Sequence, residues 1–209
     1  MFEIEYKGAN SVIISTKKAK IVVDPKLSLV GIKDLSVKGA IELLTEDRFA
    51  VNGSGSILII DSPGEYGIAD FDIRGIPARR NLDSEGHSST MYRIEIDNNR
   101  VGLIGNIYEQ LSDEQLEDLG VIDMLIIPVG GGGYTLDATG AAALVRTIGP
   151  KVVIPIHYAD RQLKYETPQN QLDLFVKEMS APVETVAKYK VKQTLGHLTQ
   201  LSIIEVTRS

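Results

Sequence analysis

The stretch TEDRFAV, residues 45–51, combines two carboxylates and a guanidinium group in seven residues. It follows the apolar residues 41–44, which have the length and composition of a short buried strand. Loops at strand ends often carry functional side chains. Glu46, Asp47 and Arg48 are therefore candidates for acid-base chemistry or for the lining of a cleft. The alternative is a solvated turn.

Other polar side chains also follow predicted strands. His157 comes after Ile-Pro-Ile, at the strand end where ligands tend to bind in open α/β sheets. It is a candidate base, and a locally hydrogen-bonded histidine is the alternative. Asp24 precedes Pro25 and is a candidate acid or a turn residue. Asn106 ends an apolar strand and tolerates tight-turn geometry.

Four consecutive glycines, residues 130–133, lie between a predicted strand and a predicted helix. Such a loop can hold phosphate, because free N–H groups and the helix dipole point there. No Lys-Ser or Lys-Thr follows, so the loop is not a P-loop. We expect Gly131 and Gly132 to line a cleft, with a flexible connection as the alternative. Arg80, in an Arg-Arg pair, is a candidate anion ligand or a solvated side chain.

The available side chains disfavour a metal site of the usual kind. The chain has three histidines and no cysteine, and no two histidines form an H-x-H or H-x-x-x-H pair. Catalytic zinc normally takes three protein ligands from His, Cys or carboxylate groups. We therefore expect no cofactor, and zinc or another divalent ion only at a non-standard site. His87 and His197 lie in polar segments and are expected to be exposed.

The predicted elements place these side chains at strand ends. The first half of the chain reads as short strands, with a hairpin turn at residues 97–99 and a polar turn at VNGSGS, residues 51–56. The second half alternates helices with apolar strands at residues 123–128 and 152–156. Continuous apolar strands are normally covered by helices. The pattern predicts an α/β fold arranged as a layered sandwich.

Three helices are expected in the second half. Ser112 and Gln115 fit a capping box at the start of the first helix. Thr135 is the expected cap of the second. Thr167 and Pro168 are the expected start of the third, because proline is favoured at the first helical position. The segment QLSIIEV is expected to close the chain as part of a hairpin.

Bulk properties indicate an ordinary globular chain. It has 209 residues, of which 43% are hydrophobic and 24% charged, and we expect a single domain over residues 1–209. A net charge of -6 disfavours nucleic-acid partners. Since no apolar run reaches the length of a membrane helix and no signal peptide is evident, we expect no membrane association and a cytoplasmic location.

Seven segments follow one another in a recognisable order: KIVVDP, IELLTEDRFAVN, PGEYGI, IRGIPARR, YRIEIDNNRVGLIGN, MLIIPVGGGGYTLDA and PKVVIPIHY. In this order the chain resembles the metallo-β-lactamase superfamily, in its branch of lactonase-like metal-dependent hydrolases, from about residue 2 to about residue 180. The resemblance implies a four-layer αβ/βα sandwich with a metal site at one edge between the sheets.

The family's metal motif, T-H-x-H-x-D-H after a strand, matches residues 45–51. Its paired histidines correspond to Glu46 and Arg48, its aspartate to Ala50 and its last histidine to Val51. Arginine stays protonated and cannot coordinate a metal. Alanine and valine side chains have no lone pair. The resemblance therefore implies that this part of the metal site has been replaced.

The remaining ligand positions follow the same trend. A further family histidine corresponds to Arg80, within about one position, and the bridging aspartate corresponds to Asn106. Of the family's ligands only His157 is retained, and Asp24 matches an Asp-Pro step of the family. Without metals there is no activated water and no Lewis acid. We expect Arg48 or Arg80 to supply the positive charge, with Glu46 or Asp47 as its partner.

Three functions are compatible with these residues. The first is a non-catalytic binding, regulatory or structural module with a degenerate metal site, a pseudoenzyme. The second is a metal-dependent hydrolase of a small ester, lactone or phosphorylated compound, with a non-standard site in which His157 is the base. The third is an anion-binding protein. The expected partner is a small molecule or anion, or another protein, and the chain is a candidate homo-oligomer.

Overall fold

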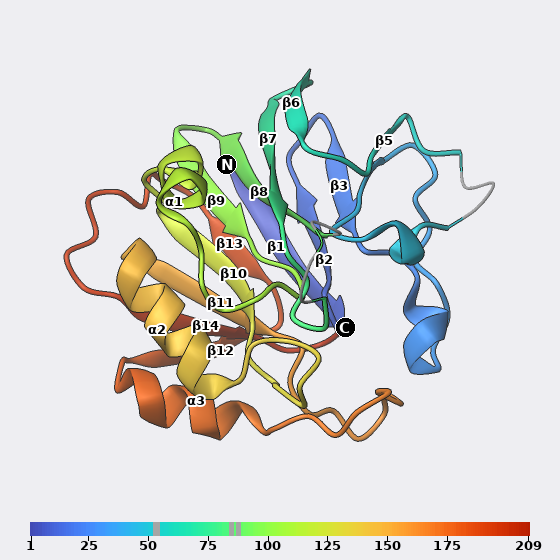
Figure 1. The fold of residues 1–209 in the computed structure, drawn as a ribbon. Coiled ribbons are helices and arrows are strands. Elements are labelled where there is room, and N and C mark those ends of the chain that lie inside the picture. The colour runs from blue at the N-terminus through green and yellow to red at the C-terminus, as the bar shows by residue number, and fades with distance from the viewer. Residues whose placement is uncertain (52–54, 84–85, 87–88) are drawn as a thin grey trace.

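The computed structural model describes residues 1–51, 55–83, 86 and 89–209. His87 and residues 52–54 of the predicted polar turn at residues 51–56 lie outside these ranges. Within them, the chain forms a six-stranded sheet, an eight-stranded sheet and three α-helices. The two sheets pack against each other, and the helices lie beyond the eight-stranded sheet (Figure 1).

The six-stranded sheet has the order β13-β1-β2-β3-β4-β5. Its first strands pair antiparallel, whereas β3, β4 and β5 run parallel to one another. The carboxyl ends of β3 and β4 therefore meet at the same edge. The strands are β1 (Phe2–Gly8), β2 (Ser11–Ser15), β3 (Lys20–Val23), β4 (Ile41–Leu43), β5 (Leu58–Ile60) and β13 (Tyr189–Val191).

The eight-stranded sheet has the order β12-β14-β11-β10-β9-β8-β7-β6. The strands from β12 to β9 are parallel, and those from β9 to β6 are antiparallel. The predicted hairpin at residues 97–99 joins β8 to β9. The strands are β6 (Gly64–Ile68), β7 (Phe71–Ala78), β8 (Ser89–Ile96), β9 (Asn99–Leu103), β10 (Met124–Pro128), β11 (Val152–Ile156), β12 (Val183–Val186) and β14 (Ser202–Val206).

Alternation along β1 shows how the strands divide between core and solvent. Phe2, Ile4 and Tyr6 are buried in the cluster between the two sheets, while Glu3 and Glu5 face outward. The central strands β10 and β11 are buried on both faces, because the second cluster lies between them and the helices. The continuous apolar runs of these strands reflect that double burial.

The helices are α1 (Asp113–Leu119), α2 (Ala138–Ile148) and α3 (Leu172–Met179), and they confirm the α/β sandwich. The predicted capping box of Ser112 and Gln115 is present.

The outer face of the six-stranded sheet is covered differently in the described residues. A small apolar cluster of Val22, Val37 and Ala40 covers part of it, and Lys188 lies 2.9 Å from both Glu3 and Glu5 farther along.

Two predicted helix starts are wrong. The N-cap of α2 is Asp137, whose carboxylate accepts from the N–H of Gly140 at 2.8 Å, and Thr135 is instead buried in the preceding loop. α3 begins after Gln171 rather than at Thr167 and Pro168. The N–H of Asn170 donates to the carbonyl of Gly130 at 2.7 Å, so tertiary hydrogen bonds hold this backbone out of the helix.

The predicted closing hairpin is also wrong. β12 and β14 are parallel neighbours in the eight-stranded sheet, and β13, which lies between them in sequence, pairs with β1 in the other sheet. Local alternation does not reveal which sheet a strand joins. Within the described ranges, no helix is long and apolar enough to cross a membrane.

Candidate functional site

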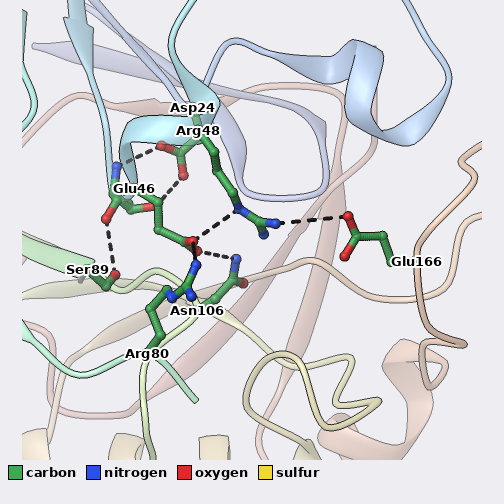
Figure 2. Close-up of polar contacts among 8 residues, drawn as sticks. Asp24, Glu46, Arg48, Arg80, Ser89, Asn106 and Glu166 are labelled. Carbon is green, nitrogen blue, oxygen red and sulfur yellow. Dashed lines mark hydrogen bonds and ion pairs between the residues drawn. The ribbon is translucent and has the colours of Figure 1, made fainter. Parts of the chain in front are cut away.

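Strand ends from both sheets converge at one edge of the sandwich. In the six-stranded sheet Asp24 follows β3, and Glu46 lies three residues after the end of β4. In the eight-stranded sheet Asn106 follows β9 and His157 follows β11. Figure 2 shows Asp24, Glu46 and Asn106 together with the side chains that meet them.

Glu46 is the centre of a buried ion-pair cluster and is only 3% exposed. Its Oε2 lies 3.1 Å from Nε of Arg48 and 3.1 Å from Nη1 of Arg80 (Figure 2). Its Oε1 accepts from the side-chain amide of Asn106, also at 3.1 Å. One carboxylate thus contacts two guanidinium groups and one amide. We call Glu46, Arg48, Arg80 and Asn106 the ion-pair cluster.

The two arginines reach Glu46 from different elements. Arg48 belongs to a short 3₁₀ helix, Asp47–Phe49, and its guanidinium lies 4.7 Å from the ring centre of Phe49 and 4.8 Å from that of Tyr134. Such cation–π contacts restrict the guanidinium orientation. Arg80 follows β7 and is fixed by an isolated β-bridge to Ile107.

Asp24 is a buried acid beside the cluster. Its two carboxyl oxygens accept from the backbone N–H and the hydroxyl of Thr45, at 2.8 Å and 2.6 Å. Burial raises the pKa of Asp24 to about 8, although the hydrogen bonds from Thr45 oppose the shift. Thr45 packs closely against Gly105. A Cβ at residue 105 would lie only 2.8 Å from the Thr45 side chain, so this position requires glycine.

His157 is 4% exposed and has a left-handed backbone, with φ of 52°. Its N–H donates to the hydroxyl of Tyr6 at 3.1 Å. The described residues offer no hydrogen-bond partner to its Nδ1. Burial, helped by the charge of Arg48, lowers the pKa of His157 to about 3, so the ring is neutral at pH 7.

A pocket opens beside His157, and we call it the His157 pocket. Its cavity volume is about 50 Å³, which suits a ligand of only a few heavy atoms. Arg48 belongs to its polar lining. The apolar part of the lining includes residues of a 3₁₀ helix, Leu27–Val30. The polar side chains that line it are Asn10, Ser11, Asp24, Lys26, Arg48, Asn106, Tyr134, His157, Tyr165, Glu166, Thr167 and Gln169.

The structure brings most of the candidate residues together, but not all. Asp47 is exposed, and among the described residues it is not an ion-pair partner of Arg48 or Arg80. Gly131 and Gly132 are not among the residues that line the His157 pocket. They pack against Asn170 and Pro168, where side chains would collide. Arg80 lines a smaller neighbouring space on the other side of Asn106. The exposure of His197 agrees with its prediction.

Sequence reasoning missed several residues of the His157 pocket. Asn10 lies in the turn between β1 and β2, Lys26 follows Asp24-Pro25, and Gln169 lies before α3. None belongs to a motif, and only the packing of three separate loops places them around His157. Tyr134 directly follows the four glycines and is the one member with a local signal.

The residues at the family's metal positions do not fit a metal ion. Two permanently charged guanidinium groups lie 3.1 Å from Glu46, the one carboxylate among the replaced ligands. Ala50 and Val51 offer no donor atom. Among the described residues, no three His, Cys, Asp or Glu side chains converge as metal ligands would.

Comparisons with known proteins agree with the fold. A candidate Zn-dependent hydrolase of the metallo-β-lactamase superfamily from Thermotoga maritima superposes with a TM-score of 0.79 at 23% identity, covering 99% of this chain and 100% of that one. Igni18, a metallo hydrolase from Ignicoccus hospitalis, gives 0.68 at 17% identity over 91% and 99% of the two chains. A candidate metal-dependent hydrolase from Parabacteroides distasonis gives 0.67 at 17% identity over 100% and 94%.

No curated protein sequence matches the chain significantly. The family model described as a beta-lactamase superfamily domain matches residues 3–157, from β1 to the end of β11 at His157. That match covers most of the chain and every strand end that builds the site. With this sequence match and the shared two-sheet architecture, the chain belongs to the metallo-β-lactamase superfamily.

Proposed function

We propose that this chain is a metal-independent binding protein built on the metallo-β-lactamase fold, and that it does not catalyse the metal-dependent hydrolysis of its relatives. The observation that carries the proposal is the ion-pair cluster. Glu46 contacts Arg48, Arg80 and Asn106 at 3.1 Å each. By the family resemblance, Glu46 and Arg48 stand at two ligands of the metal motif, Arg80 at a further histidine within about one position, and Asn106 at the bridging aspartate, and here the four side chains contact one another.

Electrostatics support the replacement of the metal by arginine. A divalent ion beside Arg48 and Arg80 would meet two fixed positive charges, and Glu46 is the one carboxylate that pairs with both of them among the described residues. The cluster holds positive charge at this edge without a metal. His157 is neutral at pH 7, and because its Nδ1 has no partner in the described residues, it remains available to a ligand.

Elemental analysis tests the proposal directly. The protein is produced in medium supplemented with zinc, manganese and iron, purified without chelator and analysed by mass spectrometry of the elements. We expect a content far below one equivalent of any of these metals, and no change in melting temperature on adding chelator. Near-stoichiometric metal, together with a melting temperature lowered by chelator, would overturn the proposal.

A variant offers a matched comparison for the same assay. Arg48→His combined with Ala50→Asp and Val51→His returns three family ligands beside His157, which is already in place. We expect this variant, if it folds, to retain more zinc than the parent. Hydrolysis of a generic lactone or phosphodiester by the parent protein, abolished by His157→Ala, would instead support a hydrolase with a non-standard site.

A further inference from the structure

The His157 pocket contains polar atoms that nothing in the described chain satisfies. Oδ1 of Asn10 and Nδ1 of His157 have no hydrogen-bond partner, and their residues are 3% and 4% exposed. Oδ1 of Asn106 is also unpartnered, whereas the amide nitrogen of this residue donates to Glu46. Buried polar atoms normally have a partner, so these atoms indicate a ligand that donates and accepts hydrogen bonds.

The charges around the pocket favour an anion. Arg48 and Lys26 line it, together with the Glu166 side chain, which is 65% exposed. Glu46 does not line the pocket but pairs with both Arg48 and Arg80. The cations Arg48, Arg80 and Lys26 outnumber the acids Glu46 and Glu166 by one. Arg48 and Lys26 are the cationic side chains of the lining, and both carboxyl oxygens of the lining residue Asp24 are hydrogen-bonded to Thr45.

Arg48 is prepared to receive a carboxylate. Its Nε side is occupied by Glu46, and its guanidinium is held near the rings of Phe49 and Tyr134. The nearest acid to its Nη1 is Glu166, at 4.0 Å, which is too long for a hydrogen bond (Figure 2). The terminal nitrogens of Arg48 can therefore form the paired hydrogen bonds that guanidinium groups make with carboxylates.

Size and apolar lining narrow the ligand further. The cavity volume is about 50 Å³, so the part of a ligand that is buried in the pocket is limited to a few heavy atoms. Leu27 and Val30 contribute an apolar wall that an inorganic anion would not use. We propose that the His157 pocket binds a short-chain hydroxycarboxylate, with the carboxylate on Arg48 and the hydroxyl group among Asn10, Asn106 and His157.

This inference rests on the proposed function, because a metal at the same edge would compete with Arg48 for the carboxylate. The two can fail separately. Metal-free protein that binds no hydroxycarboxylate contradicts only the ligand assignment, whereas protein carrying stoichiometric metal contradicts both.

Isothermal titration with matched probes tests the assignment. Glycolate is expected to bind roughly threefold to tenfold more tightly than acetate, because it adds one hydrogen-bonding hydroxyl. Lactate is expected to bind more tightly than glycolate by about threefold, because its methyl group adds apolar contact. Inorganic phosphate should bind more weakly than lactate. Equal affinity for glycolate and acetate, or phosphate binding at least as tight as lactate, overturns the proposal.

Variants locate the binding. Arg48→Lys keeps the charge but loses the planar fork, and is expected to weaken lactate binding at least about tenfold. Lys26→Gln is the safer variant for folding, since Lys26 is part-exposed, and is expected to weaken it about threefold. Lys18→Gln removes the same charge from an exposed turn outside the pocket and should change nothing. Lactate affinity unaffected by both pocket variants places any binding elsewhere and refutes the assignment.

Discussion

The ion-pair cluster and the His157 pocket are neighbours that differ in how their polar side chains find partners within the chain. In the cluster, both carboxylate oxygens of Glu46 are in use, and Arg48 and Arg80 share this one carboxylate, although the Nε of each arginine has no hydrogen-bond partner among the described residues. In the pocket, Nδ1 of His157 and Oδ1 of Asn10 have no partner among the described residues. Asn106 belongs to both regions, because its amide nitrogen donates to Glu46 in the cluster while the residue also lines the pocket and its buried amide oxygen has no partner among the described residues.

This difference separates structural from functional polarity. A buried charge is tolerated only with a compensating partner, so buried Glu46 depends on Arg48, Arg80 and Asn106. An unpartnered buried polar atom costs free energy unless a ligand or water satisfies it. The cluster should therefore respond to mutation through stability, and the pocket through binding.

The largest expected effect is the loss of Glu46. Glu46→Ala leaves two guanidinium groups near each other without their shared carboxylate. Because both arginines are about one-third exposed, we expect a loss of about 3 kcal/mol in the free energy of unfolding, at the low end for a broken buried ion pair. Urea denaturation measures it.

Asp47→Ala is the matched control for that experiment. Asp47 is the adjacent acid and is exposed, so its removal should leave the urea midpoint unchanged. If the two variants lose the same stability, the cluster is not the structural unit described above.

The next effect is a pH dependence that comes from the pocket. Asp24 has a pKa of about 8 in the fold against 3.8 ordinarily, so its contribution to stability falls as pH rises between these values. His157 has a pKa of about 3 against 6.5, so its contribution rises with pH over that interval. The two offset each other between about pH 4 and pH 6.5. From pH 6.5 to pH 8, Asp24 alone acts, and the free energy of unfolding should fall by about 2 kcal/mol.

Variants isolate the two contributions. Asp24→Asn should abolish the fall above pH 6.5 in urea titrations at a series of pH values. His157→Asn should remove the offset, so that the decline begins near pH 4, and asparagine tolerates the left-handed backbone at this position. An unchanged decline in Asp24→Asn would show that another group causes it.

The smallest effect comes from removing one arginine. Arg80→Ala leaves Glu46 with Arg48 and Asn106, so we expect a loss of about 1 kcal/mol. Combined with Glu46→Ala, the loss should be smaller than the sum of the single losses, with a coupling of about 1 kcal/mol. Strict additivity would mean that Arg80 and Glu46 do not interact.

Local pattern predicted much of the fold because it depends on short-range periodicity. The β-branched runs of the first half are strands, and the capping box at Ser112 begins α1. Where long-range pairing decides the structure, the pattern failed. The backbone at Thr167 stays out of the helix because the nearby N–H of Asn170 donates to the carbonyl of Gly130. The strands β12 and β13 belong to different sheets.

The sequence by itself determined the residue types at the metal positions. The side chains of Arg48, Ala50 and Val51 cannot ligate a metal in any fold. The guanidinium group stays protonated, and alanine and valine side chains have no lone pair. The family membership likewise follows from the order of strand-end segments, since each is read locally.

Only the tertiary structure decided how the replaced residues are used. Glu46 and Arg80 are 34 residues apart, and Glu46 and Asn106 are 60 apart, yet they meet because parallel strand ends of two sheets share one edge. The same packing buries Asp24 and His157, which sets their pKa values, and brings Asn10 and Lys26 to the pocket. Burial and convergence belong to the assembled fold, and no local stretch of sequence contains them.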